Sequence, residues 1–323
     1  IMVEAYLQMG EQQLADDIVE CCQAGASVVH FHVTDARGRP TLDTSFFHQV
    51  VRLVRSRCDI IVQGSTGGVG STVEERSVAL TVPGVEMASL NMGSCNLFGQ
   101  AYVNAPEEVR AWARRMRERK IVPDCCFFDG GFFTMLDWLA ERGLAIQPCV
   151  AGLCLGFPNA LPATVENLVF MKSKLPLGAM WTLVQHGYRD FSLLAAAIAC
   201  GGNIRVGFED SPWLAPDQKA RCNRELVEKA RTLIQHLGHS VATPAEMRRR
   251  QQPLDHPAVT QVGLDDLVDV ALVDEAVPDR FRVHHRHRTG RTAVEATGFV
   301  DPDLAGAGQP RRLHLRLAAV ERR

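Results

Sequence analysis

The first three quarters of the chain alternate between short apolar runs and amphipathic helical stretches, and this alternation limits the possible folds more than any other feature. The apolar runs predict eight strands, over residues 2–7, 28–33, 60–65, 87–91, 125–128, 146–155, 180–185 and 203–209. Strands that alternate with helices form parallel sheets, and eight such units favour a closed (β/α)8 TIM barrel of the α/β class. A doubly wound open sheet is the alternative, but no Gly-x-Gly-x-x-Gly sequence follows the first strand.

The character of the sequence changes after about residue 250. We therefore expect a catalytic barrel domain over 1–250 and a C-terminal extension, partly helical or mobile, over 251–323. Within the extension, residues 253–277 favour one further helix, and residues 280–288 are rich in arginine and histidine. We interpret the remainder as a solvated tail or an arm that contacts another subunit. Adventitious metal binding by its histidines is the alternative.

Composition argues against several partners and locations. A net charge of −2 gives no reason to expect nucleic acid or a membrane surface as partner. No apolar run approaches the roughly 20 residues of a membrane span, and Glu4 and Glu11 interrupt any signal peptide. The ten cysteines include no Cys-x-x-Cys pair, so we expect a protein of the reducing cytoplasm rather than one held by disulfides.

Two of the predicted strands carry residues typical of a metal site. His30 and His32 lie two apart on one strand, so their side chains point to the same side. Glu209 lies at the end of the last strand, which is a neighbour of the first strand in a closed barrel. Two imidazoles and one carboxylate form the kind of set that binds catalytic zinc with one position open. Two histidines buried in the barrel without an ion are the alternative.

Arg205 and Asp210 suggest an acid–base pair beside that set. Arg205 lies four residues before Glu209 in an otherwise apolar strand, where an arginine is costly to bury without an anionic partner. It should pair with Asp210 or with a substrate carboxylate. Because adjacent acids at a strand end point in different directions, Glu209 can bind metal while Asp210 serves as base. A solvated acidic turn is the alternative.

Hydroxyl and amide side chains at the ends of two neighbouring strands predict a polar wall for a small, oxygen-rich substrate. Ser65 and Thr66 precede consecutive glycines at the end of one strand, and Ser89 and Asn91 end the next. The glycines would let backbone N–H groups approach an anion. A plain tight turn explains them equally well, since no Lys-Ser or Lys-Thr follows.

Five stretches taken together resemble the β-keto acid cleavage enzyme family, typified by 3-keto-5-aminohexanoate cleavage enzyme. They are His-Phe-His-Val-Thr-Asp at 30–35, Ser-Thr-Gly-Gly at 65–68, Met-Ala-Ser-Leu-Asn-Met-Gly-Ser at 87–94, Gly-Gly-Asn-Ile-Arg-Val-Gly-Phe-Glu-Asp at 201–210, and the region from 223–227 to 241–244. The resemblance covers the chain from near residue 1 to about 250. The order and combination of the five stretches are specific to this family. Taken singly, only the stretch of the last strand, 201–210, is specific.

This resemblance implies a (β/α)8 barrel that binds zinc and uses acetyl-CoA as cosubstrate. Enzymes of this kind convert a β-keto acid and acetyl-CoA into acetoacetate and a new acyl-CoA. Position by position, it implies that His30, His32 and Glu209 bind zinc and that Asp210 with Arg205 forms the base dyad. Ser65 and Ser89 become candidate polar contacts in the pocket. The small-molecule partners would be a β-keto acid and acetyl-CoA, and we expect a homo-oligomer.

Three departures from the family pattern concern the substrate. Thr34 stands where the family usually has arginine, and Cys126 occupies the position of an acid on the fifth strand. This suggests a substrate side chain that is neutral or differently charged. The loop after the first strand is short, which leaves Glu11 a weak candidate for an acid there.

Two other functions compete with this interpretation. The first is another metal-dependent barrel enzyme, either a hydrolase or an aldolase. A hydrolase of the amidohydrolase kind would usually have further histidines at the ends of strands five and six. These strands offer cysteines instead, and His186 ends strand seven. A degenerate, non-catalytic family member is the other. The zinc and dyad positions are all intact, which argues against it.

Overall fold

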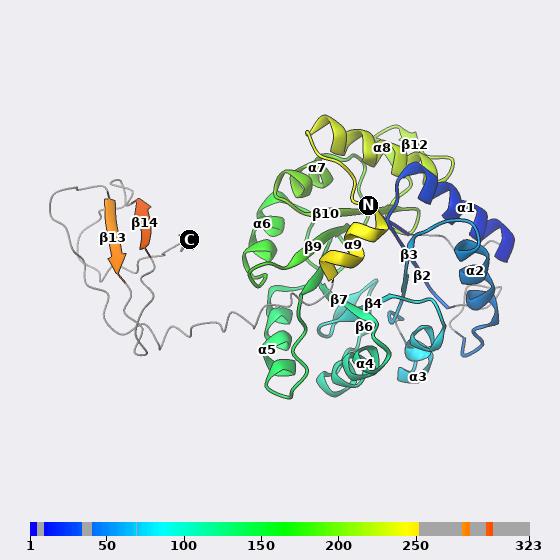
Figure 1. The fold of residues 1–323 in the computed structure, drawn as a ribbon, viewed down its shortest axis with the longest axis horizontal. Helices are drawn as coiled ribbons and strands as arrows, with labels where there is room; N and C mark the ends of the chain where they lie inside the picture. The colour runs from blue at the N-terminus through cyan, green and yellow to red at the C-terminus, as the bar shows by residue number, and fades with distance from the viewer. Residues whose placement is uncertain (5–9, 34–40, 69, 252–279, 285–294, 300–323) are drawn as a thin grey trace. The chain divides into compact units, whose positions relative to one another are not determined.

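A closed barrel of parallel strands forms the centre of the molecule, as the sequence predicts. The computed structural model describes residues 1–4, 10–33, 41–68, 70–251, 280–284 and 295–299. The strand order around the barrel is β1-β10-β9-β8-β7-β4-β3-β2 (Figure 1). The strands are β1 Met2–Glu4, β2 Val28–Phe31, β3 Ile61–Gly64, β4 Met87–Asn91, β7 Val122–Phe127, β8 Val150–Leu155, β9 Met180–Gln185 and β10 Asn203–Gly207.

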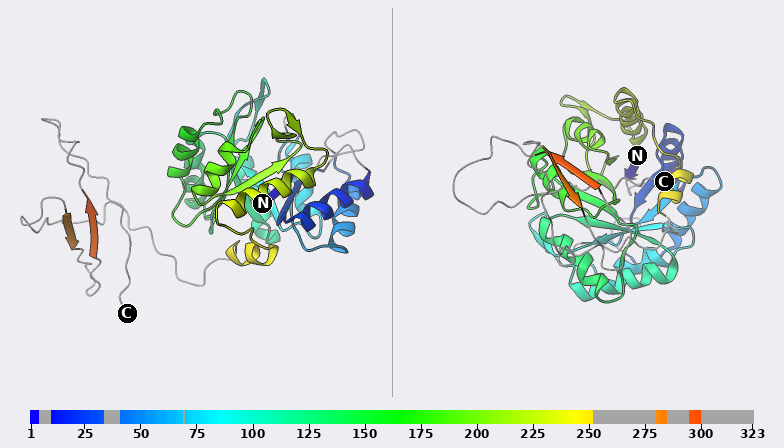
Figure 2. Two further views of the ribbon diagram at one scale, coloured as in Figure 1. Left: turned by 90° about the horizontal axis from the view of Figure 1, so that it is seen from above. Right: turned by 60° about the vertical axis from the view of Figure 1, so that its left-hand side comes forward.

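Helices surround this barrel on the outside, which Figures 1 and 2 show from three directions. The helices are α1 Glu11–Ala24, α2 Ser45–Arg55, α3 Val73–Ser77, η1 Val78–Thr81, α4 Pro106–Arg119, η2 Gly130–Phe133, α5 Thr134–Ala140, α6 Val165–Ser173, α7 Ser192–Ala199, α8 Asn223–His236 and α9 Pro244–Gln251. Barrel strands that are consecutive along the chain are thus joined by crossovers that return along the outer surface, and the pairing of β1 with β10 closes the barrel.

Two small hairpins interrupt the alternation on the side where the barrel strands end, and the sequence analysis did not predict them. β5 Cys95–Leu97 pairs with β6 Gln100–Tyr102 after β4, and β11 Trp213–Ala215 pairs with β12 Gln218–Lys219 after β10. Loops at this end of a TIM barrel carry the active sites of its enzymes. The hairpins therefore belong to the functional end of the barrel.

The core lies mainly between the strands and the helices, and it determines which side chains face the lumen. On β2, Phe31 points outward and stacks on Phe47 of α2, with ring centroids 4.1 Å apart. Both rings are fully buried. Because successive residues of a strand point to opposite faces, the outward Phe31 places His30 and His32 toward the lumen.

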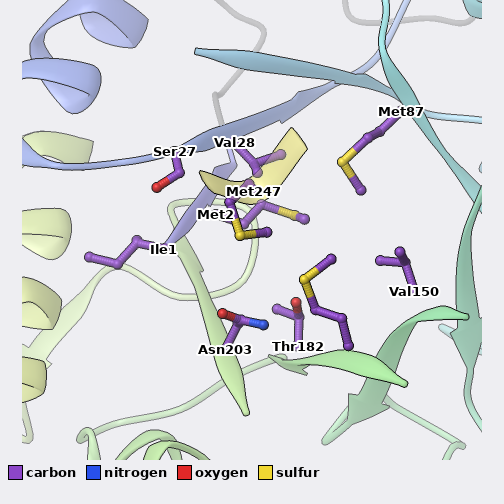
Figure 3. A pocket seen from close by; sticks show the side chains of 10 residues that line it. Ile1, Met2, Ser27, Val28, Met87, Val150, Thr182, Asn203 and Met247 are labelled. Atoms are coloured by element: carbon purple, nitrogen blue, oxygen red, sulfur yellow. The ribbon is translucent and has the colours of Figure 1, made fainter. Parts of the chain in front are cut away.

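The amino-terminal end of the barrel is closed by α9. Ser27 donates a hydrogen bond to the backbone oxygen of Ala242, and Gln251 contacts the sulfur of Met87. A pocket under the helix is lined mostly by apolar side chains, including Met2 and Met247 (Figure 3). It lies at the end of the strands opposite to the predicted site.

The chain divides into two compact units, Ile1–Leu254 and Asp255–Arg323. In the second unit the described residues form an antiparallel pair, β13 Arg280–His284 and β14 Glu295–Phe299. The first of these strands falls within the basic stretch that we expected in a solvated tail. The helix expected over 253–277 lies outside the described residues, and the domain limits stay a prediction. In the part of the chain that the structure describes, none of the helices has the length and apolar character to cross a membrane.

Candidate active site

β1 brings the two most informative strands to the same part of the barrel. Its backbone pairs with β2 on one side and with β10 on the other, so Glu4 is in register with both His30 and Gly207. The barrel closure predicted this neighbourhood, since the first strand must lie between the second and the last. The carboxyl ends of β2 and β10 therefore lie on either side of β1, one strand apart.

The three predicted metal ligands come together at this place. The rings of His30 and His32 meet edge to face, with centroids 5.2 Å apart. His32 Nε2 lies 3.6 Å from Glu209 Oε1. Within the described ranges, no three His, Cys, Asp or Glu side chains lie in an arrangement that would hold an ion directly. Closure on an ion would therefore need small movements of His32 or Glu209, whose side chains are both partly exposed.

A buried chain of hydrogen bonds orients His30. Its Nδ1 lies 2.5 Å from Gln63 Oε1, and Gln63 Nε2 donates to Asp124 Oδ2 at 2.8 Å. Since the amide of Gln63 presents its oxygen to His30, Nδ1 must carry the proton of the neutral ring. The lone pair is then on Nε2, and in this tautomer Nε2 can coordinate a metal ion. All three side chains are buried.

Burial also sets the charge of this histidine. Burial, with smaller contributions from the nearby His32 and Arg205, lowers the pKa of His30 to about 3, against the opposing effects of Glu209 and Gln63. The imidazole is therefore neutral at neutral pH. A neutral imidazole is the protonation state that binds metal. The donor set and this tautomer together fit a zinc ion in chemical terms.

Arg205 and Asp210 form the pair that the sequence predicted. Arg205 Nε donates to Asp210 Oδ2 at 2.7 Å, and Nη2 donates to Oδ1 at 2.5 Å. Two parallel bonds of this kind fix orientation as well as charge. Burial raises the pKa of Asp210, and the charge and hydrogen bonds of Arg205 oppose that rise. The result is a carboxylate with increased basicity that is held in one position.

A tight turn after β10 directs the side chains of Glu209 and Asp210 to different partners. The backbone N–H groups of Asp210 and Ser211 both donate to the oxygen of Gly207, at 3.1 and 2.9 Å. Asn223, the first residue of α8, accepts a hydrogen bond from the backbone N–H of Phe208 at 3.0 Å. The turn places the carboxylate of Glu209 toward His32, while that of Asp210 points to Arg205. This is the divergence expected for adjacent acids at a strand end.

Of the residues predicted to form a polar wall, Thr66 and Ser89 bind each other. Thr66 Oγ1 donates to the backbone oxygen of Ser89 at 2.5 Å, and the N–H of Thr66 donates to Ser89 Oγ at 3.0 Å. These bonds join the ends of β3 and β4. Ser65 Oγ accepts from the N–H of Gly67 at 2.9 Å. Asn91, buried on β4, is in register with Cys126 of β7.

The remaining candidates are placed as follows. Glu11 is exposed at the start of α1, and Thr34 lies outside the described residues. Cys126 lies on β7 two residues after Asp124, so both side chains face the same way. The sequence analysis missed the roles of Gln63 and Asp124. The signal that could have found them is a polar residue at an alternate position of an apolar strand.

Comparison with known proteins shows extensive similarity. Residues 5–252 match the family described as beta-keto acid cleavage enzyme. The chain is 35% identical over 241 residues to a 3-keto-5-aminohexanoate cleavage enzyme from Fusobacterium nucleatum subsp. nucleatum, covering 74% of this chain and 88% of that protein. It is 29% identical over 270 residues to a 3-dehydrocarnitine:acetyl-CoA trimethylamine transferase from Rhizobium meliloti, covering 76% and 90%.

A solved structure supports the fold alone. The apo structure of ObcA is similar with a TM-score of 0.64 and 18% sequence identity, over 76% of this chain and 65% of that one. This chain thus spans slightly less than two thirds of the solved structure. At such low identity the likeness concerns the barrel and not its chemistry.

Proposed function

The chain belongs to the β-keto acid cleavage enzyme family, and from this premise we propose that it is a zinc-dependent enzyme that exchanges acyl groups between a β-keto acid and acetyl-CoA. It is an acetyl-CoA-dependent enzyme that cleaves a carbon–carbon bond, as the names of its relatives indicate. The observation that carries the proposal is the meeting of His30, His32 and Glu209 beside the Arg205–Asp210 pair.

The proposed reaction is balanced without an oxidant or reductant. In the β-keto acid, the bond between the ketone carbon and the CH₂ group that carries the carboxylate breaks. A new bond forms between that CH₂ carbon and the acetyl carbon of acetyl-CoA, which gives acetoacetate. The CoA thiolate leaves the acetyl group and ends on the remaining acyl group as a new acyl-CoA.

The residues of the chain supply the proton transfer. Asp210 would remove a proton from the carbon between carboxylate and ketone, since it is the base held in one orientation by Arg205. It would return this proton to the same carbon when the bond to the original ketone carbon breaks. His30, His32 and Glu209 would hold zinc, which when bound polarises the oxygens of the substrate and makes that carbon more acidic. Ser65 and Asn91 would contact the polar part of the substrate.

Two alternatives are less well supported. An amidohydrolase-like enzyme would place histidines at the ends of β7 and β8, where this chain has Cys126 and Cys154. A non-catalytic protein has no need of the buried, doubly hydrogen-bonded Arg205–Asp210 pair. A homo-oligomer in the cytoplasm stays a prediction.

The test is acetoacetate formation by the zinc-loaded protein. Acetoacetate should appear only when both acetyl-CoA and a β-keto acid are present, and its amount should equal that of the new acyl-CoA. The metal content, measured by elemental analysis, should be one zinc per chain. Acetoacetate formed without acetyl-CoA, or no acetoacetate from any member of a panel of β-keto acids, would overturn the proposal.

A further inference from the structure

We infer that the lumen end formed by β7, β8 and β9 is the site for an uncharged, apolar acyl side chain, so that the substrates are β-keto acids with alkyl or aryl side chains. This inference rests on the proposed function and adds the class of substrate to it. It is carried by the side chains that face the lumen from these three strands and by the aromatic rings above them.

The lumen side of these strands is identified by contacts around Gly152. A methyl group at this position of β8 would lie 3.6 Å from Cys126 Sγ, 3.6 Å from Val184 Cγ2 and 3.7 Å from Asp124 Oδ1. Asp124 in turn accepts a hydrogen bond from the buried Gln63 of β3, with β4 between the two strands. Asp124, Cys126, Gly152 and Val184 therefore face one common space.

Above the level of Asp124 this space is lined by sulfur and hydrocarbon. Cys126 and Cys154 lie on the neighbouring strands β7 and β8 and pack in one apolar cluster. Burial raises the pKa of the Cys154 thiol well above its usual range, so it carries no charge. Val184 packs with Cys154 in the same apolar cluster.

A row of aromatic rings continues the apolar surface outward. The ring of Tyr102, from the β5–β6 hairpin, lies 6.4 Å from that of Phe128, and Phe128 lies 5.2 Å from Phe157. Phe157 stacks on His186 at 4.9 Å, and Phe98 meets His186 edge to face at 5.4 Å. Phe98 is half exposed, so the row extends from the lumen to the surface.

Two members of this aromatic row, Tyr102 and His186, lie near the candidate active site. At one end, a methyl group on Gly67 would lie 3.3 Å from Tyr102 Oη and 3.8 Å from His32 Cε1. Near His186, the next residue, Gly187, donates its N–H to the backbone oxygen of Asp210 at 2.8 Å. The row therefore borders the same space as the metal ligands and the base.

Apart from Asp124 at its base, whose Oδ2 accepts a hydrogen bond from Gln63, the acidic and basic side chains that border this space come from the opposite half. Arg205, Glu209 and Asp210 come from the end of β10, whereas the lumen positions of β7, β8 and β9 above Asp124 carry no Asp, Glu, Lys or Arg. Arg76 approaches the row from behind Tyr102, but its N–H groups bond the oxygens of Thr66, Val103 and Asn104.

This division orients the substrate. The carboxylate and the ketone belong beside Asp210 and the metal ligands, because these are the charged groups of the site. The acyl side chain must then extend toward Cys126, Cys154 and the aromatic row. A charged group placed above the level of Asp124, beside Cys126, Cys154 and the aromatic row, would lose its hydration without meeting an opposite charge there, which is costly.

The test compares β-keto acids that differ only in the charge of the side chain. 5-Methyl-3-oxohexanoate and 5-amino-3-oxohexanoate have nearly the same shape, with a methyl group in place of an ammonium group, and 3-oxoadipate supplies a carboxylate. We expect kcat/KM for the methyl compound to exceed that for either charged compound by about 100-fold or more. Acetoacetate is measured in every case.

Variants at Cys126 test whether the acyl side chain of the substrate lies beside this residue. Cys126→Glu should lower the preference for the methyl over the amino compound by about 10-fold or more, because the new carboxylate would pair with the ammonium group. Cys126→Ser, which is similar in size, should keep the wild-type preference. Cys200→Glu places the same acid at the end of α7, shortly before β10 begins and so at the end of the barrel away from the site, and should leave the substrate preference unchanged.

The outcomes separate this inference from the proposed function. A wild-type enzyme that prefers the amino compound or 3-oxoadipate would overturn the apolar site and leave β-keto acid cleavage intact. An unchanged preference in a folded Cys126→Glu variant would show that the side chain lies elsewhere. Failure of all three compounds to yield acetoacetate would overturn the proposed function and this inference together.

Discussion

Gln63 accepts a hydrogen bond from Nδ1 of His30 at 2.5 Å and donates another to Asp124 at 2.8 Å. The amide therefore determines which ring nitrogen of His30 carries the proton. In water the two tautomers of histidine exchange freely, but here the acceptor on one side selects the Nδ1–H form. Gln63, which is not itself a proposed metal ligand, thus selects the tautomer in which His30 would bind a metal ion.

Replacement of Gln63 by methionine should release this control. Met has a similar length but no amide, so His30 loses its acceptor and populates the Nε2–H tautomer. We expect zinc affinity to fall by about 10- to 100-fold, as for other residues that orient a metal ligand. Chelator competition measures the affinity, and ¹⁵N NMR of the metal-free protein reports the tautomer.

The control for this prediction exchanges the two polar groups. Gln63→Glu with Asp124→Asn keeps an acceptor toward His30 and a donor–acceptor contact between the two partners. This double variant should regain the Nδ1–H tautomer and much of the zinc affinity. If Gln63→Met keeps both the wild-type tautomer and the wild-type affinity, Gln63 does not orient His30.

Substitutions in the Arg205–Asp210 pair should affect turnover rather than metal binding. Asp210→Asn keeps the shape of the side chain but removes the base, and kcat should fall by about 100- to 10,000-fold. Arg205→Lys loses the paired hydrogen bonds, so kcat should fall by a smaller factor. Steady-state kinetics and zinc content are measured together, and full activity of Asp210→Asn would show that another group is the base.

Glu209 should behave in the opposite way. Glu209→Gln removes the only carboxylate of the predicted ligand set, so zinc content and activity should be lost together. Because the Glu209 side chain is about half exposed, the fold should not depend on it, and the melting temperature of the metal-free variant should match that of the metal-free wild type. Stoichiometric zinc in this variant would exclude Glu209 as a ligand.

Much of this site could be predicted from the sequence because the barrel imposes it. The apolar runs identified the strands, and closure required that the strand carrying His30 lie near the one carrying Glu209. The Arg205–Asp210 pair followed from the cost of an unpaired buried arginine. These inferences need only the order of the strands.

The role of Gln63 could not be predicted in the same way. Its partners His30 and Asp124 are 33 and 61 residues away, and their contact depends on the register of four strands rather than on their order. The aromatic row also escaped prediction. Phe98, Phe157 and His186 lie in loops or at strand ends, where no periodicity indicates their direction. The hairpin that carries Tyr102 has strands of three residues, which are too short to give a pattern.

The last prediction concerns how the stability of the fold depends on pH, and it follows from the ion pairs by which α9 closes the amino-terminal end. Arg248 of this helix hydrogen-bonds both Asp59 and Glu86. The hydrogen bonds from Arg248 lower the pKa of Asp59. For Glu86, burial raises the pKa, but hydrogen bonds from Arg248 and Arg55 outweigh it and the pKa is lowered.

Carboxyl groups with a lowered pKa in the folded state stabilise the fold above their unfolded pKa values, and this stabilisation is lost as the pH falls through the folded values. Arg248→Gln should therefore lower the free energy of unfolding at pH 7, by an amount on the order of 1 kcal/mol because the pairs are partly exposed. Below about pH 4, where the carboxyl groups become protonated, the difference from wild type should shrink. Urea unfolding of both proteins at pH 7 and at acid pH measures it. A difference that is equally large at both pH values would mean that Arg248 acts through packing of its side chain and not through its charge.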